Sequence, residues 1–132
     1  MKQLKDKKFF LLDMDGTIYL DNNLFDGTLD FLKKVRDTGG RYLFVTNNSS
    51  KGVDAYVKKL EGLGIPATCD DFLTSTDALI IYLKKTYPNK LFYAMGTTSF
   101  VNQLRDAGIS VCLDARDDVF GLIISNDTEL TF

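Results

Sequence analysis

The sequence has 132 residues, 45% of them hydrophobic, which is enough for a globular domain with a buried core. Its formal net charge of −2 gives no electrostatic footprint for binding nucleic acid or an anionic membrane. It contains no histidine and only two cysteines, far apart at Cys69 and Cys112, which excludes a Ser-His-Asp triad and a His–Cys zinc site.

The first half of the sequence alternates strand and helix patterns. Residues 9–12 are a continuous apolar run, as expected for a strand that is buried on both faces. Apolar residues then recur at helical spacing over residues 29–35, and two glycines end this helix. Residues 41–46 are typical of a second strand, and a helix with Tyr56 and Leu60 on one face follows it.

The next helix is predicted from Asp77 to about Thr86. Ser75 or Thr76 could cap its beginning, and Pro88 prevents its continuation. The side chains expected to pack against the rest of the fold are Ala78, Ile81 and Tyr82.

The last third of the sequence continues this alternation. A helix with Phe100 and Leu104 on one face follows a cap at Thr97 or Thr98. The remaining strands are expected at residues 72–74, 91–95, 110–113 and 119–125. Alternating strands and helices predict an α/β fold with a parallel sheet covered on both faces, and in such sheets ligands bind at the carboxyl ends of the strands.

A polar loop with two acidic residues follows the first predicted strand. The carboxylates of Asp13 and Asp15 repel each other, and a hard cation such as Mg²⁺ relieves that repulsion. Asp13 can attack phosphorus as a nucleophile, and Asp15 can act first as the acid for the leaving group and then as the base for water. Gly16 allows a tight turn that brings its amide near an anion, and the Thr17 hydroxyl can hold the turn.

A second polar loop follows the strand at residues 41–46. The Thr46 hydroxyl and the amides of Asn47 and Asn48 are good donors to phosphate oxygens, and a helix starting soon after Ser50 would add its positive end. If the two strands are parallel neighbours, both loops open at one sheet edge, which indicates phosphoryl-transfer chemistry.

Simpler readings of each loop stay open. The first could be a surface turn or a calcium loop, although the calcium pattern has its glycine sixth, whereas here it is fourth and a strand precedes it. The second could be an ordinary polar loop. Both patterns at consecutive strand ends favour a catalytic site.

Two segments carry a resemblance to a known family. Residues 9–17 resemble the first motif of the haloacid dehalogenase superfamily, a hydrophobic strand followed by D-x-D-G-T. Residues 44–50 resemble the second motif of its NagD-like, p-nitrophenylphosphatase branch. The resemblance implies the N-terminal half of a Rossmann-like core over residues 1–88. It also implies the beginning of an inserted α/β cap domain over residues 89–132, of which residues 121–132 are similar to a cap segment.

This resemblance implies a Mg²⁺-dependent phosphatase that hydrolyses phosphomonoesters through an aspartyl-phosphate. By position, Asp13 is the nucleophile and a magnesium ligand, and Asp15 is the acid/base, with its backbone carbonyl as a second ligand. Thr46 and Asn47 bind the phosphoryl group, with Asn48 nearby. Gly16 and Thr17 complete the predicted phosphate-binding set.

The family also needs a later lysine and a later acidic motif, and this sequence contains neither. Asn126-Asp127 follows a predicted strand but lacks the glycine and the second aspartate of that motif, so we assign it to the cap. We therefore expect the chain to be the N-terminal part of a longer protein, ending within the cap. We also expect it to be inactive, or nearly so, on its own, because Asp13 and one backbone carbonyl make a poor site for Mg²⁺, which requires near-octahedral oxygen coordination.

Two functions other than a phosphatase stay open. A receiver-like signalling module also uses aspartates and Mg²⁺, but its phosphorylated aspartate follows the third strand. A non-catalytic haloacid dehalogenase-like domain would keep the motifs without turnover. The expected partner is a small phosphorylated metabolite, and self-association is expected through an exposed half-core. No apolar run reaches the length of a membrane span, so a cytoplasmic location is expected.

Overall fold

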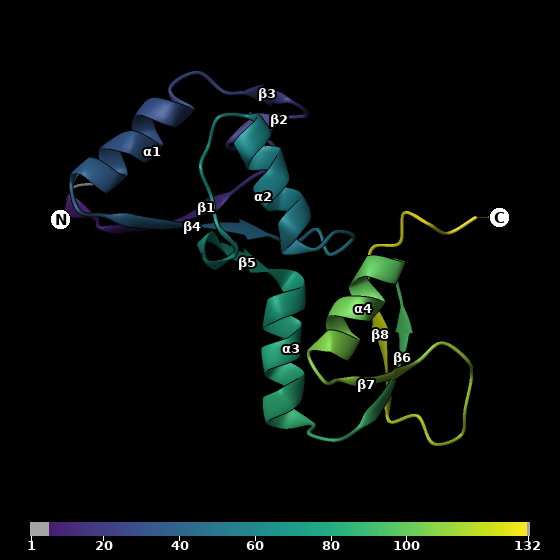
Figure 1. Cartoon of the computed structure of the whole chain (residues 1–132). Helices are drawn as coiled ribbons and strands as arrows, with labels where there is room; N and C mark the ends of the chain where they lie inside the picture. Colours follow the sequence, from purple (N-terminus) through teal and green to yellow (C-terminus); the bar gives the residue numbers. More distant parts are fainter. Residues whose placement is uncertain (1–5, 132) are drawn as a thin grey trace. The chain divides into compact units, whose positions relative to one another are not determined.

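Figure 1 shows the computed structural model, which describes residues 6–131. The chain forms two compact units. The first comprises the residues up to Thr46 together with Tyr56–Leu73, and the second comprises Asn47–Ala55 and the residues from Thr74 onward. Within residues 6–131, every helix falls short of the length and apolar character that a membrane span requires.

The first unit is built on a three-stranded sheet. Its strands are β1 (Phe9–Asp13), β4 (Arg41–Thr46) and β5 (Phe72–Thr74), with β4 in the middle. β1 and β4 are parallel, and their register places Phe10 beside Tyr42 and Asp13 beside Val45. The strands predicted at residues 41–46 and 72–74 are confirmed, and so is the parallel pairing of the first two.

Aromatic side chains join the helices of this unit to the sheet. The helices are α1 (Thr28–Asp37) and α2 (Val53–Gly62). Phe31 of α1 meets Phe10 edge-on, with ring centroids 5.5 Å apart, and Tyr56 of α2 lies 6.2 Å from Phe72. Phe72 in turn lies 5.5 Å from Phe44 of β4. In register, Phe10 and Phe44 point to the same side of the sheet, so both helices pack on that one face.

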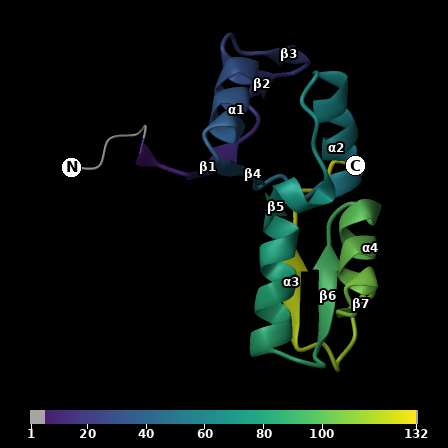
Figure 2. The same cartoon turned by 60° about the vertical axis from the view of Figure 1, so that its left-hand side comes forward.

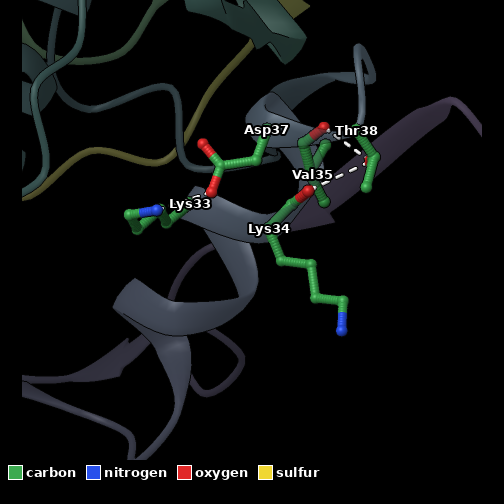
Figure 3. A network of polar contacts seen from close by, with 5 residues as sticks. All are labelled: Lys33, Lys34, Val35, Asp37 and Thr38. Carbon is green, nitrogen blue, oxygen red and sulfur yellow. Dashed lines mark hydrogen bonds and ion pairs between the residues drawn. The ribbon is translucent and has the colours of Figure 1, made fainter.

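Hydrogen bonds close the end of α1 (Figure 3). The Thr38 hydroxyl donates to the carbonyl oxygens of Lys34 and Val35, both at 3.0 Å. Lys33 and Asp37 form an ion pair one turn apart on the exposed side. The helix therefore stops where the sequence predicts, just before the two glycines.

A small antiparallel hairpin and a 3₁₀ turn also belong to the first unit. The hairpin pairs β2 (Tyr19–Leu20) with β3 (Asn23–Leu24), and the turn is η2 (Cys69–Asp71). The sequence pattern does not predict the hairpin. Two-residue strands are too short to show an alternating pattern, so periodicity cannot reveal them.

The second unit has its own parallel sheet. Its elements are α3 (Ser75–Thr86), β6 (Leu91–Met95), α4 (Thr98–Asp106), β7 (Ser110–Cys112) and β8 (Gly121–Ile124). β6 is central and runs parallel to both β7 and β8 (Figures 1 and 2). The three predicted strands of this region are confirmed, β6 with the predicted bounds and β7 and β8 with shorter ones. The predicted division between core and cap near Pro88 stays a prediction.

The core of the second unit lies between its sheet and its two helices. Phe100 and Leu104 of α4 are buried against Phe92 of β6 and Leu83 of α3. Thr97 caps α4, because its hydroxyl accepts a hydrogen bond from the Phe100 amide at 3.2 Å. The predicted packing face of α4 and one of its two predicted caps are therefore confirmed.

The prediction for α3 was wrong in its cap and in its packing face. Thr74, not Ser75 or Thr76, caps the helix, and Thr76 and Leu83 are the buried residues. The side chains expected to pack are exposed, with Ile81 at 63% and Tyr82 at 52%. The helix carries two apolar stripes, and periodicity alone cannot tell which stripe meets the sheet. The third residue that was predicted to pack, Ala78, is exposed as well.

The prediction that helices cover both sheet faces was also wrong for the described residues. Phe9 and Leu11 of β1 are 55% and 62% exposed, and Leu122 and Ile124 of β8 are 57% and 70% exposed. A continuous apolar run fits a strand buried on both faces. It equally fits a strand whose second apolar face stays open in this chain.

Candidate active site

Hydrogen bonds to two carbonyl groups fix the turn after β1. The Gly16 amide donates to the Tyr19 carbonyl oxygen at 2.8 Å, and the Thr17 amide donates to that of Met14 at 3.1 Å. Gly16 has a φ of 81°, in the left-handed region that residues with a Cβ rarely adopt. Its amide is used within the turn, so anion binding by that amide stays a prediction.

Buried residues anchor this turn while its acidic residues face outward. Met14 and Ile18 are 0% and 4% exposed, so their packing holds the turn against the first unit. Three residues next to these two in sequence are exposed, namely Asp13, Asp15 and Thr17. The turn therefore presents two carboxylates and a hydroxyl from a rigid base.

The end of β1 lies beside the end of β4. Asp13 is the last residue of β1 and pairs with Val45, so the next residue, Thr46, stands at the same edge of the sheet. Thr46 is 5% exposed, and its side chain lies near enough to Tyr56 of α2 to lower the pKa of that phenol. Parallel pairing thus places the backbones of Asp13 and Thr46 at one edge of the sheet, and their roles in a site stay predictions.

The segment after Thr46 is folded by its own hydrogen bonds and belongs to the second unit. Asn48 Oδ1 accepts from the Ser50 amide at 3.0 Å and from the Ser50 hydroxyl at 2.7 Å. The Ser75 hydroxyl donates to the Asn47 carbonyl oxygen at 3.1 Å. Any hydrogen bond that Asn47 or Asn48 donates to a phosphate would therefore come from an N–H group. These phosphate-binding roles stay predictions.

Three residues around Asp15 were not assigned to the site from the sequence. Lys59 of α2 places its Nζ 3.7 Å from Asp15 Oδ1 and 3.9 Å from the centroid of the Tyr19 ring. Tyr56, one helical turn before Lys59, is buried and lies near Thr46. The three-residue spacing of Tyr56 and Lys59 indicates one helix face, but only the fold brings that face to Asp15.

Burial and charge shift both tyrosines of this cluster. Burial first, and then the neighbouring Asp15 carboxylate, raise the pKa of Tyr19 well above its usual value. Within the described part of the chain, the Tyr19 hydroxyl lies near Asp15 without a well-formed hydrogen bond. Burial also raises the pKa of Tyr56, while the nearby Thr46 side chain opposes that rise. Both phenols are therefore neutral at physiological pH.

The donors present suit magnesium in kind. Asp13 and Asp15 offer carboxylate oxygens, and the turn bonds to Met14 and Tyr19 leave the Asp15 carbonyl outside their network. Mg²⁺ takes oxygen ligands and is commonly held by one or two carboxylates, with water and substrate phosphate in the other positions. Among residues 6–131, no group of three or more acidic, cysteine or histidine side chains could hold a metal ion. The protein part of such a site would thus be these two aspartates.

Comparison with known sequences assigns the chain to a family. Residues 10–110 match the haloacid dehalogenase-like hydrolases. The chain is 30% identical over 131 residues to an acid sugar phosphatase of Staphylococcus saprophyticus, and 31% identical over 129 residues to one of Staphylococcus epidermidis. Each match covers 98% of this chain and 49% of the relative. The chain therefore spans about half the length of these curated relatives.

Solved structures share the same fold. A 4-nitrophenylphosphatase of Thermotoga maritima has a TM-score of 0.83 at 30% identity, over 95% of this chain and 47% of its own. A putative NagD protein has a TM-score of 0.87 at 31% identity, over 98% and 50%. A glycerol phosphate phosphatase of Mycobacterium tuberculosis, solved in complex with magnesium, has a TM-score of 0.85 at 26% identity, over 97% and 39%.

An α/β fold whose first strand runs into the D-x-D-G-T turn, together with the match over residues 10–110, defines the class. The chain belongs to the haloacid dehalogenase-like hydrolase family. Its similarity lies with the NagD-like, p-nitrophenylphosphatase branch, as the T-N-N-S segment predicts. The resemblance and the α/β fold class inferred from the sequence are confirmed.

Proposed function

We propose that the edge formed by β1 and β4 is the catalytic edge of a magnesium-dependent phosphomonoesterase. The observation that carries this proposal is the parallel register that sets Asp13 beside the end of β4, where Thr46 stands. The residues proposed as the nucleophile and the hydroxyl donor thus end two neighbouring strands at the sheet edge where α/β folds bind ligands. The phosphatase relatives support the same chemistry.

The proposed reaction has two displacements at phosphorus. A carboxylate oxygen of Asp13 forms a bond to phosphorus while the bond to the leaving oxygen breaks, and Asp15 gives that oxygen its proton. A water molecule then attacks the aspartyl-phosphate and passes a proton to Asp15. This step releases inorganic phosphate and restores the Asp13 carboxylate. Thr46 and the amides of Asn47 and Asn48 would bind the phosphoryl oxygens.

Magnesium, when bound, would neutralise negative charge on the phosphoryl group and on the carboxylates. Asp13 and the Asp15 carbonyl are the groups we assign to hold it. This assignment rests on the oxygen donors at the end of β1 and on the family, in which the M. tuberculosis relative was solved with magnesium.

The substrate class we propose is a small phosphorylated metabolite. The relatives named acid sugar phosphatase and glycerol phosphate phosphatase favour a sugar or polyol phosphate. We also propose that the chain self-associates through its open apolar sheet faces, and that it works in the cytoplasm.

Phosphate release from p-nitrophenyl phosphate with Mg²⁺ tests the proposed function. It should be measured for the 132-residue chain and for the longer protein expected to contain it. We expect turnover by the longer protein, at most weak turnover by this chain, and loss of both in Asp13→Asn. Asp21→Asn, an exposed aspartate in the turn between β2 and β3, is the matched control and should keep the activity.

Two other outcomes would each point to a rival function. Phosphate that stays bound to the chain after incubation with a small phosphodonor would favour the receiver-like module. Absence of turnover at both lengths, with intact folding, would favour a non-catalytic domain. Robust turnover by the 132-residue chain, abolished by Asp13→Asn, would contradict the expected inactivity of this chain alone.

A further inference from the structure

The side of the first unit where α2 meets the turn after β1 holds a cation that the proposed reaction does not yet use. Lys59 is half-buried, its side chain 30% exposed, and its Nζ lies 3.7 Å from Asp15 Oδ1. The Asp15 side chain is 56% exposed. An exposed ion pair at this distance is weak by itself, so the contact needs a further cause to be persistent.

Tyr19 supplies that cause. The centroid of its ring lies 3.9 Å from Lys59 Nζ, well within the range of a cation–π contact. The Tyr19 side chain is 0% exposed and has no freedom to leave. The ammonium of Lys59 therefore rests on a fixed aromatic surface, and less conformational entropy is lost when it also meets Asp15.

The same ring is tied to the backbone of Asp15. Asp15 and Tyr19 form a β-bridge, closed by the Gly16 amide donating to the Tyr19 carbonyl oxygen at 2.8 Å. The surface that holds Lys59 and the backbone that carries the Asp15 carboxylate are thus parts of one rigid turn. Movement of one relative to the other would require this turn to open.

The same helix face also lies near the second strand end. Tyr56 lies three residues before Lys59 on α2, and Thr46 is near enough to oppose the rise of the Tyr56 pKa. One face of α2 therefore lies near both Thr46, at the end of β4, and Asp15, after the end of β1. A helix in this position can fix the two sides of the proposed site relative to each other.

We propose that Lys59 is a positioning residue that holds the Asp15 side chain in one orientation, with the Tyr19 ring as its platform. The proposal rests on the proposed function, because Asp15 is there the acid that protonates the leaving group. An acid works only when it lies within hydrogen-bond reach of that oxygen. A carboxylate drawn to one side by Lys59 samples fewer orientations than a free one on an exposed turn.

The orientation of Asp15 can be measured without any turnover. In the isotopically labelled 132-residue chain, three-bond couplings report the χ1 rotamer of Asp15. We expect one dominant rotamer in the wild type, averaging between rotamers in Lys59→Met, and recovery in Lys59→Arg. Lys58→Met, its exposed neighbour on α2, is the matched control and should keep the wild-type couplings.

The consequence for catalysis depends on the leaving group. In the longer protein, p-nitrophenyl phosphate needs little protonation, whereas an alkyl phosphate such as glycerol phosphate needs it fully. We expect Lys59→Met to lower kcat about tenfold for the alkyl ester and little for the aryl ester. This loss is part of the roughly 10²- to 10⁴-fold that general acid–base catalysis supplies. KM should stay nearly unchanged for both.

Each result decides a separate claim. Averaged Asp15 couplings in the wild type, or couplings unchanged in Lys59→Met, would overturn the positioning role whatever the turnover. A higher KM for both esters with unchanged kcat would overturn it too, because Lys59 would then bind the phosphate itself. A fixed Asp15 rotamer that depends on Lys59, without hydrolysis of either ester, would leave the positioning intact and refute the proposed function.

Discussion

Single buried tyrosines make the first unit sensitive to alkaline pH. Tyr42 is 5% exposed, and burial raises the pKa of its phenol, while the Arg36 guanidinium, 5.0 Å from the ring centroid, opposes that rise. Because its folded pKa is raised, the folded chain holds this proton more tightly than the unfolded chain. The resulting stability is complete below about pH 10 and is lost as the pH rises through the folded pKa.

Above about pH 10, we therefore expect the free energy of unfolding to fall less steeply with pH in Tyr42→Phe than in the wild type. The two slopes should differ by at most about 1.4 kcal/mol per pH unit, the limit for one proton. The free energy of unfolding from urea titrations, measured from neutral to strongly alkaline pH, gives the comparison. Tyr93→Phe, a half-buried tyrosine of β6, serves as the control. Identical alkaline slopes for Tyr42→Phe and the wild type would show the expectation to be wrong.

Residues of the site differ in how far the sequence reveals them. Asp13 and Thr46 can be predicted because each directly ends an apolar strand, and parallel pairing then places both strand ends at one edge of the sheet. The roles of Lys59 and Tyr19 could not be predicted from the sequence, because they depend on a tertiary contact. Their contact joins a helix to a turn 40 residues away in sequence, and nothing local to either segment records it. A residue that acts through a tertiary contact has to be found in the fold.

At the scale of elements, a reciprocal pair of hydrogen bonds starts α3. The Thr74 hydroxyl accepts from the Asp77 amide at 3.1 Å, and the Asp77 carboxylate accepts from the Thr74 amide at 2.9 Å. Thr74 is 2% exposed, so this capping box is shielded from water. Thr68 and Asp71 form a box of the same kind on the exposed turn η2.

We expect Thr74→Ala to lower the free energy of unfolding by about 1 to 2 kcal/mol, in the upper part of the range for a lost N-cap. Thr68→Ala is the matched control. We expect it to cost less than half as much, because water can replace its hydrogen bonds and only a three-residue turn depends on them. Denaturant midpoints of the two variants and the wild type provide the measurement. Equal losses would mean that burial does not set the strength of the cap.

A helix or strand is predicted well where the spacing of its apolar residues fits a single arrangement. It is predicted badly where the same spacing fits two different packing faces. β4 and β5 have the predicted bounds, because short apolar strands lie between clear polar breaks. α3 was predicted with its apolar contacts on the wrong stripe, since it carries apolar residues on two sides. The hairpin of β2 and β3 was missed, because strands of two residues are too short to show an alternating pattern.

For the whole molecule, the open sheet faces follow from the number of helices that each sheet receives. Both helices of the first unit pack on the Phe10 and Phe44 face, which leaves Phe9 and Leu11 exposed on the other. The second sheet likewise exposes Leu122 and Ile124. The sequence predicts apolar strands but not which of their faces are covered, because a covering element has to come from elsewhere in the chain or from another molecule.

An uncovered apolar face on an edge strand should bind a second copy of the chain. β1 has a single neighbour in its sheet, so its outer backbone groups are unpaired within that sheet and its exposed side alternates Phe9 and Leu11. We expect the 132-residue chain to sediment as dimers or larger species at concentrations on the order of 10 μM, where exposed strand edges associate. Leu11→Lys places a charge on that face and should shift the chain toward monomer. Ile81→Lys is the control, because Ile81 is equally exposed, at 63%, but stands on a helix whose backbone is already bonded. A wild-type chain that sediments as a monomer, or an equal shift in both variants, would show that the β1 edge does not drive the association.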